Sequence, residues 1–244
     1  MDWGRYDAAL FDLDGVVTPT AEVHMRAWAT MFEEFLRSRG VSEAYTDADY
    51  YAHVDGMPRY DGVRSFLASR GITLPEGDPS DDPATESVAG LGNRKNEAFN
   101  EVLRTDGVTA YAGSVMLIEH LAERGIPMAI VSSSRNAPAV LEAAGLTAHF
   151  ETVMHGGVAA ERGLSGKPAP DTFLAAAADL GVGPSGCVVL EDAVSGVAAG
   201  AAGEVGLVVG VDRGAGAEAL TDAGADVVVS DLMELLPAPG EETA

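Results

Sequence analysis

The stretch AALFDLDGV, residues 8–16, carries two carboxylates and a glycine directly after a short apolar run. A run of a few residues that is apolar on both faces is typical of a buried strand in a parallel sheet. Asp12 and Asp14, at positions i and i+2, would then lie near the carboxyl end of that strand. Buried charges are costly unless something offsets them. A helix cap or a turn explains one such Asp but explains two poorly, so the pair favours a site for a metal ion and a phosphate.

Apolar runs rich in Val, Leu and Ile recur later in the chain and predict further buried strands at 128–132, 152–154, 187–190, 206–211 and 226–229. Helical patterns separate these runs, at 115–124, 137–144, 171–180 and 194–202. Strand alternating with helix predicts an α/β fold, in which helices flank a parallel sheet through right-handed crossovers.

One long segment interrupts this alternation. Between about residues 21 and 107 no buried-strand run is found, and amphipathic helical patterns dominate, as at Ala27–Arg39 and Gly62–Arg70. We therefore predict a helical domain, residues 21–107, inserted into an α/β domain made of residues 1–20 and 108–244. Ligands in open α/β sheets bind beyond the carboxyl ends of the strands. An insertion after the first strand would therefore lie over the site as a lid.

Polar residues also occur at the ends of other predicted strands. They are the segment SSSRN at 132–136, the loop GKPAPD at 166–171 around Lys167, and the pair Glu191 and Asp192. Each has an ordinary explanation: a Ser-rich turn, an exposed lysine, or acids that cap a helix. Their conjunction with the first carboxylate pair favours an active site at the carboxyl ends of the strands.

The composition excludes several classes of partner. The chain of 244 residues carries 38 acidic and 15 basic side chains, for a formal net charge of −23 and a pI near 4.3. This charge opposes non-specific binding to nucleic acid or to an anionic membrane, because both need a positive field. The N-terminus lacks the basic and apolar regions of a leader, and no run approaches the ~18 apolar residues of a membrane span. We expect a cytoplasmic protein with no nucleic-acid or membrane partner.

The set of motifs resembles that of the haloacid dehalogenase superfamily of phosphotransferases, over essentially the whole chain. The matching elements are DxDG at 12–15, the hydroxyl residue Ser132, the motif lysine Lys167, and the acidic residues Glu191 and Asp192. The segments TAEVHMRAW (20–28), NRKN (93–96) and GKPAPD (166–171) are similar to the β-phosphoglucomutase group of that superfamily. The resemblance implies a Rossmann-like core with an α-helical cap inserted after the first motif.

The resemblance also implies roles for the residues at the strand ends. Asp12 would be the nucleophile that forms an aspartyl phosphate, and Asp14 would be the general acid and base. A magnesium ion would be held by Asp12, the Asp14 carbonyl and Asp192, with Glu191 in support. Ser132 would help to cradle the transferring phosphoryl group.

Both lysines of the chain fall in these motifs, whereas the other basic residues are all arginines. Lys167 would balance the negative charge at Asp12 and the phosphoryl group as a compact point charge. Lys95, on the cap, would reach the sugar when the lid closes.

A mutase must also hold a second phosphate away from the metal. The substrate-binding residues implied by the resemblance are His24, Arg59, Lys95, Ser133, Ser134, Arg135 and Asn136. Arg59 and Arg135 would grip the second phosphate, because a guanidinium can bind its oxygens in a bidentate manner. A solvated cation at a helix start is the plain alternative for Arg59, and a half-buried helix histidine is the alternative for His24.

The implied activity is the interconversion of β-D-glucose 1-phosphate and glucose 6-phosphate through a 1,6-bisphosphate, by a monomer that binds a small-molecule sugar phosphate. The rival on the same scaffold is a phosphatase acting on a hexose, disaccharide or specialised-metabolite sugar phosphate. Pro19, where relatives usually carry an acidic residue, could alter the hinge and favour hydrolysis. A catalytically idle binding module is a third reading, and the intact motifs speak against it.

Overall fold

The computed structural model describes residues 1–237 and divides into two compact units. The sheet unit comprises residues 1–19 and the chain from Thr109 on, and the helical unit comprises Thr20–Val108. Residues 238–244, which end the predicted α/β domain, lie outside the described residues.

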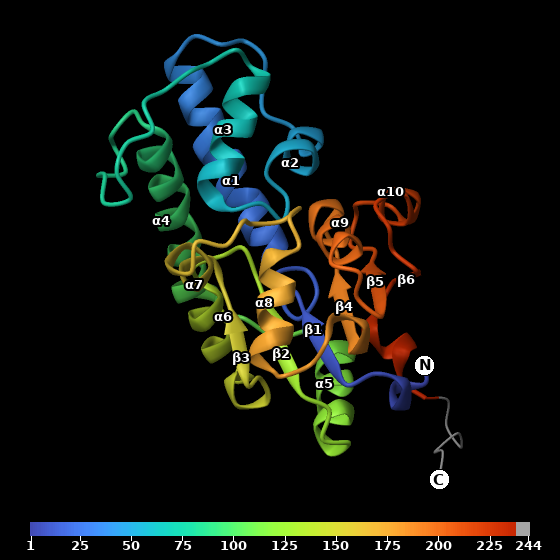
Figure 1. The fold of residues 1–244 in the computed structure, drawn as a ribbon. Helices are drawn as coiled ribbons and strands as arrows, with labels where there is room; N and C mark the ends of the chain where they lie inside the picture. Colours follow the sequence, from blue (N-terminus) through green and yellow to red (C-terminus); the bar gives the residue numbers. More distant parts are fainter. Residues whose placement is uncertain (238–244) are drawn as a thin grey trace. The chain divides into compact units, whose positions relative to one another are not determined.

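Six parallel strands form the sheet of the described chain (Figure 1). In spatial order they are β3 (Thr152–Met154), β2 (Met128–Val131), β1 (Ala8–Phe11), β4 (Cys187–Glu191), β5 (Leu207–Val211) and β6 (Val227–Val229). β1, β2 and β4 are buried along their whole length, as expected of strands that are apolar on both faces. The predicted α/β fold is confirmed.

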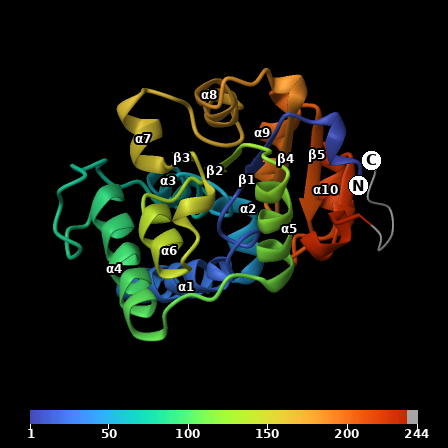
Figure 2. The same ribbon diagram turned by 90° about the horizontal axis from the view of Figure 1, so that it is seen from below.

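Helices cover both faces of this sheet. They are α5 (Ala112–Glu123), α6 (Ala137–Ala143), α7 (Gly156–Glu161), α8 (Asp171–Asp179), α9 (Val194–Ala202) and α10 (Ala217–Asp222), with 3-10 turns at Trp3–Arg5, Thr147–His149, Pro184–Gly186 and Leu232–Leu235. Figure 2 shows α8 on one face of the sheet and α5 and α6 on the other. The core between α8 and the sheet contains Leu10, Val131, Phe173, Ala176 and Val189. Because all the strands run parallel, their carboxyl ends meet at one edge of the sheet.

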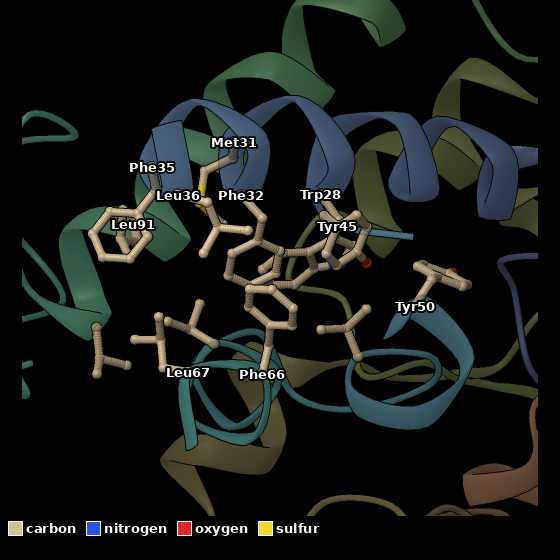
Figure 3. Packing of buried hydrophobic residues seen from close by; sticks show 13 residues of the cluster. Trp28, Met31, Phe32, Phe35, Leu36, Tyr45, Tyr50, Phe66, Leu67 and Leu91 are labelled. Atoms are coloured by element: carbon tan, nitrogen blue, oxygen red, sulfur yellow. The ribbon is translucent and has the colours of Figure 1, made fainter. Parts of the chain in front are cut away.

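The helical unit contains α1 (Thr20–Ser38), α2 (Asp47–His53), α3 (Arg59–Ser69) and α4 (Val88–Asp106). An aromatic core holds them together: Figure 3 shows Trp28 and Phe32 of α1 facing Phe66 of α3. The ring centroid of Phe32 lies 4.1 Å from that of Phe66 and 5.2 Å from that of Trp28. Every member of this buried cluster lies within the helical unit, which therefore has a hydrophobic core of its own.

Two helices of this unit differ from the sequence-based expectation. α1 begins at Thr20 instead of Ala27, because its first turns carry polar side chains such as His24 that do not extend the apolar stripe. α4 was not predicted, since Gly90 and Gly92 in its first turns lower the helical propensity. The Ser87 hydroxyl caps this helix by accepting a hydrogen bond from the Gly90 N–H at 2.9 Å. None of the described helices has the length and apolar character needed to cross a membrane.

Candidate active site

The first carboxylate pair lies where β1 ends. The Asp12 N–H donates to the Leu190 carbonyl at 2.9 Å, which continues the ladder between β1 and β4 by one residue. The chain then turns, and Gly15 takes a φ of +91°, a conformation that favours glycine. A Cβ at Gly15 would also lie 1.8 Å from Oδ2 of Asp192. The glycine of DxDG therefore allows the loop to pack directly against the carboxylate that follows β4.

Lys167 joins two of the buried carboxylates. Its Nζ donates to Oδ1 of Asp12 at 2.5 Å and to the Val131 carbonyl at 2.9 Å, and it forms an ion pair with Glu191. All three charged side chains are buried. The ammonium group thus offsets two acids that would be costly to bury without it.

The protonation of this group follows from burial and from charge. Burial raises the pKa of Asp12 well above its ordinary value, Lys167 opposes that rise, and the neighbouring acids Glu191 and Asp14 add to it. Burial acts on Lys167 in the opposite direction, but Asp12 and Glu191 together hold its pKa above the ordinary value. Lys167 is therefore charged at neutral pH, and a second cation next to Asp12 would favour the carboxylate form.

The acids at the ends of β1 and β4 form a cluster that could hold a metal ion. Carboxylate oxygens of Asp12, Glu191 and Asp192 lie within 4.8 Å of one another. The oxygens of Glu191 are engaged, because Lys167 pairs with Oε1 and the Ala193 N–H donates to Oε2 at 3.0 Å. A donor set made of oxygens alone suits a hard divalent cation.

Ser132 connects the second predicted motif to the first. Its N–H donates to the Met154 carbonyl at 2.9 Å, which holds the residue at the end of β2. Its hydroxyl donates to Oδ2 of Asp14 at 3.3 Å and accepts from the Ser134 N–H at 3.1 Å. The structure therefore brings Asp12, Asp14, Ser132, Lys167, Glu191 and Asp192 together at one edge of the sheet.

The other predicted core residues lie in the loop that leads from Ser132 into α6. The Asn136 N–H donates to the Ser134 hydroxyl at 3.1 Å, so this loop is ordered by its own side chains. A Cβ at Gly156 would lie 2.4 Å from the Ser133 carbonyl, which shows how closely the start of α7 packs on the loop. Arg135 is exposed.

The predicted cap residues form two groups within the helical unit. Lys95 is buried, contacts Nδ1 of His24, and lies 5.1 Å from the ring centroid of Trp28 and 5.2 Å from that of Phe99. The His24 ring stacks on Phe99 with centroids 4.1 Å apart. In the second group, Nη2 of Arg59 donates to Oδ1 of Asn96 at 2.7 Å.

Residues 6–203 match a family model described as a haloacid dehalogenase-like hydrolase. The chain belongs to this family. It is 48% identical to a protein of Mycobacterium tuberculosis named beta-phosphoglucomutase, over 94% of this chain and 91% of that protein. It is 32% identical to hexitol phosphatase A of Escherichia coli, over 81% of this chain and 80% of that protein.

The solved structures agree on the fold. A crystal structure titled beta-phosphoglucomutase, from Clostridium difficile, superposes with a TM-score of 0.77 and covers 95% of this chain and 93% of that one, at 24% identity. The haloacid dehalogenase fold predicted from the motifs is confirmed, as is membership of an enzyme family whose named relatives include mutases and phosphatases.

Three residues next to this haloacid dehalogenase site were missed from the sequence. Arg213, Tyr111 and Ser114 all donate hydrogen bonds to carbonyls of the loop that follows Asp14. Arg213 had a usable signal, since it follows the predicted strand 206–211 in the way that Glu191 and Asp192 follow theirs. Tyr111 donates through its main chain, which leaves no trace in the residue type.

Proposed function

We propose that this chain is a phosphotransferase of the β-phosphoglucomutase type, which interconverts β-D-glucose 1-phosphate and glucose 6-phosphate through an aspartyl phosphate and a 1,6-bisphosphate. The observation that carries phosphoryl transfer is the different setting of two neighbouring carboxylates. Asp12 is paired with the buried Lys167 ammonium, whereas Asp14 is bonded to the Ser132 hydroxyl. The relative named beta-phosphoglucomutase, at 48% identity, supports the choice of substrate.

The two carboxylates divide the chemistry. An Asp12 oxygen attacks the phosphorus, and the bond from phosphorus to the sugar oxygen breaks as the acyl phosphate forms. Asp14 gives its proton to the departing sugar oxygen, and then takes a proton from the hydroxyl that attacks the acyl phosphate. Lys167, already charged and fixed beside Asp12, stabilises the negative charge that gathers there without having to move.

We assign magnesium as the cofactor, held by Asp12, Asp192 and the Asp14 carbonyl, with Glu191 supporting from its contacts with Lys167 and Ala193. When bound, the ion supplies positive charge to the oxygens of the transferring phosphoryl group. Small hard cations of this kind keep some water ligands and accept substrate phosphate, which suits a cluster of few protein oxygens.

The second phosphate of the bisphosphate needs cations away from Asp12. We assign Arg59 from the helical unit and Arg135 from the sheet unit to it, with Ser133, Ser134 and Asn136 beside Arg135. In this proposal the helical unit is the cap, and its paired His24 and Lys95 act on the sugar side of the substrate. The enzyme would work as a cytoplasmic monomer, which size-exclusion chromatography tests directly.

A sugar-phosphate phosphatase is the second candidate. Water would then replace the sugar hydroxyl in the attack on the acyl phosphate. Two observations favour it: the relative named hexitol phosphatase A, and Pro19 at the last position of the sheet unit before α1 begins at Thr20. Proline fixes φ in this connection, and exclusion of water depends on how a cap closes.

Phosphorus NMR separates the two candidates. The protein is given β-glucose 1-phosphate, magnesium and a trace of the 1,6-bisphosphate, with Asp12→Asn and Arg59→Ala variants in parallel. Accumulating glucose 6-phosphate with little inorganic phosphate supports the mutase, and inorganic phosphate as the main product supports the phosphatase. We expect Asp12→Asn to be inactive, and Arg59→Ala to lose mutase activity while it still hydrolyses a simple monophosphate. Turnover by Asp12→Asn at the wild-type rate would overturn both candidates.

A further inference from the structure

Three successive carbonyls follow Asp14, and each accepts a hydrogen bond from a residue distant in the chain. Nε of Arg213 donates to the Gly15 carbonyl at 3.1 Å, and the Ser114 hydroxyl donates to the Val16 carbonyl at 2.7 Å. The Tyr111 N–H donates to the Val17 carbonyl at 3.0 Å. All of these residues belong to the sheet unit. The loop after the first motif is therefore held from outside as well as by its own turn.

Arg213 is the side chain that connects these contacts. Its guanidinium lies 4.0 Å from the centroid of the Tyr111 ring, its Nη1 donates to the Ser230 carbonyl at 2.8 Å, and its Nη2 lies 3.6 Å from Oδ2 of Asp231. A guanidinium can make these contacts at once because it is a planar fork with several fixed donors and a face that stacks on aromatic rings. A lysine ammonium at the same place could satisfy only part of this set.

The contact with Gly15 bears on the site because of what lies on either side of that residue. Asp14 precedes it, and a Cβ on Gly15 would overlap the carboxylate of Asp192. A trans peptide is planar, so holding the Gly15 carbonyl fixes the plane of the peptide between Gly15 and Val16. Arg213 therefore constrains the main chain directly after Asp14, through its contact with the Gly15 carbonyl.

We propose that Arg213 is a positioning residue for phosphoryl transfer: it clamps the Gly15 carbonyl to the Tyr111 ring and to the segment at Ser230, and so fixes Asp14 for proton transfer. The proposal rests on the acid and base role of Asp14 given above. Tyr111 and Val17 lie in the two segments through which the chain leaves and re-enters the sheet unit, so the same clamp ties these two connections together.

The test compares Arg213→Met and Arg213→Lys with the control Arg162→Met. Arg162 also lies in the sheet unit, but its ion pair with Asp179 is on the surface. For Arg213→Met we expect kcat to fall roughly 10- to 100-fold with little change in KM, because a small misplacement of a catalytic group has a cost of this size. Arg213→Lys should recover little of the loss, and Arg162→Met should behave like the wild type.

A second readout needs no turnover. The amides of Gly15, Val17 and Thr18 are hydrogen-bonded within the loop, and we expect their hydrogen exchange in Arg213→Met to rise about tenfold over the wild type. A folded Arg213→Met variant with wild-type kcat and wild-type exchange would overturn the proposal, as would an equal loss in Arg162→Met. If Arg213→Met does not fold, Arg213→Lys carries the same comparison. A wild type that forms no glucose 6-phosphate, while exchange still rises in Arg213→Met, would count against the mutase and leave the clamp standing.

Discussion

Both lysines of this chain are buried, with 3% of Lys95 and 2% of Lys167 exposed. Lysine is among the residues least often found in a protein interior, because a buried ammonium needs partners that replace its water. Lys167 has two carboxylates, a carbonyl and the Phe173 ring, and the partners of Lys95 include a histidine nitrogen and two aromatic rings. The two carboxylates around Lys167 indicate that its charge serves to offset theirs.

Replacing Lys167 with methionine tests how far its charge holds the site together. Asp12 and Glu191 would be left buried without their cation, and we expect the metal-free protein at pH 7 to lose about 3–5 kcal/mol of unfolding free energy. The loss should shrink as the pH falls, because the pKa of the buried Asp12 is raised and its protonation removes an unpaired charge. Urea unfolding with a chelator measures it. Adding Asp12→Asn and Glu191→Gln to Lys167→Met should restore most of the stability. If Lys167→Met alone were as stable as the wild type, the prediction that the Lys167 charge stabilises the buried Asp12 and Glu191 would be contradicted.

His155 offers a pH test beside the predicted second phosphate site. Its Nδ1 accepts from the Gly157 N–H at 3.1 Å, which requires that nitrogen to be unprotonated. Burial lowers the pKa of His155, Arg135 lowers it further, and Glu161 opposes both. A lowered pKa means that this contribution to stability is present above the ordinary histidine value and is lost as the pH falls through the folded value. NMR titration should therefore give a midpoint below 6.5. Arg135→Gln should raise that midpoint, and an unchanged midpoint would contradict the coupling.

At the scale of elements, the parts that could be predicted are those whose residues face one environment. β1, β2 and β4 are buried on both faces, so an apolar run was enough to find them. α4 was not predicted from the sequence because it contains two glycines, which lower its helical propensity but allow close packing. A Cβ at Gly90 would lie 2.2 Å from the Thr85 carbonyl, and a Cβ at Gly92 would lie 2.8 Å from the Tyr60 ring. The formation of α4 therefore depends on tertiary packing, which the helical propensities of its residues do not describe.

The same distinction divides the site. Its acidic side chains could be predicted because Asp12, Asp14, Glu191 and Asp192 lie at or just after the ends of strands, where the topology brings them together. The predicted strand-end position of Lys167 is wrong, because Lys167 lies in the loop between α7 and α8 and reaches the acids through its long side chain. The position of Arg213 after a predicted strand could have placed it near the site. The clamp around Gly15 could not be predicted, since Arg213, Ser114 and Tyr111 donate to carbonyls, and carbonyls are identical at every position of the sequence. Only the fold shows which carbonyls lie within reach.

The first turn of α9 gives a prediction at this scale. A Cβ at Gly196 would lie 1.9 Å from Oε1 of Glu191 and 2.0 Å from its Cδ. Helical propensity favours alanine over glycine by about 1 kcal/mol. The clash outweighs this gain, because Glu191 is fixed by Lys167 and by the Ala193 N–H and has little room to move.

We expect Gly196→Ala to lower the unfolding free energy by about 1–3 kcal/mol, as overpacking does. It should also impair phosphoryl transfer, since Glu191 would have to release Lys167. Gly183→Ala is the matched control, because nothing lies within 4 Å of a Cβ built there. Thermal unfolding and phosphorus NMR would measure both effects. Equal stability of the two variants would mean that α9 can shift away from Glu191.

At the scale of the whole molecule, the net charge of −23 and the binding of phosphate have to be reconciled. A strongly acidic protein repels anions at long range, but that field is screened beyond a Debye length of about 8 Å at physiological ionic strength. Within that distance the charged groups of the site determine whether a phosphate is attracted or repelled. The buried Lys167 and the proposed magnesium ion would supply the positive charge at Asp12, and the acidic surface then acts chiefly on solubility.

The two tryptophans of the chain report on the two units separately. Trp3 is buried in the sheet unit, where its indole N–H donates to the Leu235 carbonyl at 3.1 Å, and Trp28 is buried in the aromatic core of the helical unit. Since each unit has its own core, we expect two unfolding midpoints in urea, seen as different fluorescence curves for Trp3→Phe and Trp28→Phe.

Magnesium should move only one of these curves. The acids assigned to magnesium all lie in the sheet unit, so magnesium should stabilise the unit that Trp3 reports, by about 2.7 kcal/mol at a hundred times the dissociation constant. The curve reported by Trp28 should stay in place, because a ligand stabilises only the unit whose folded state binds it. Adding a chelator that removes magnesium should return the first curve to its metal-free midpoint. Coincident curves that shift together would show instead that the two units fold as one, and that ligand binding energy is shared across both.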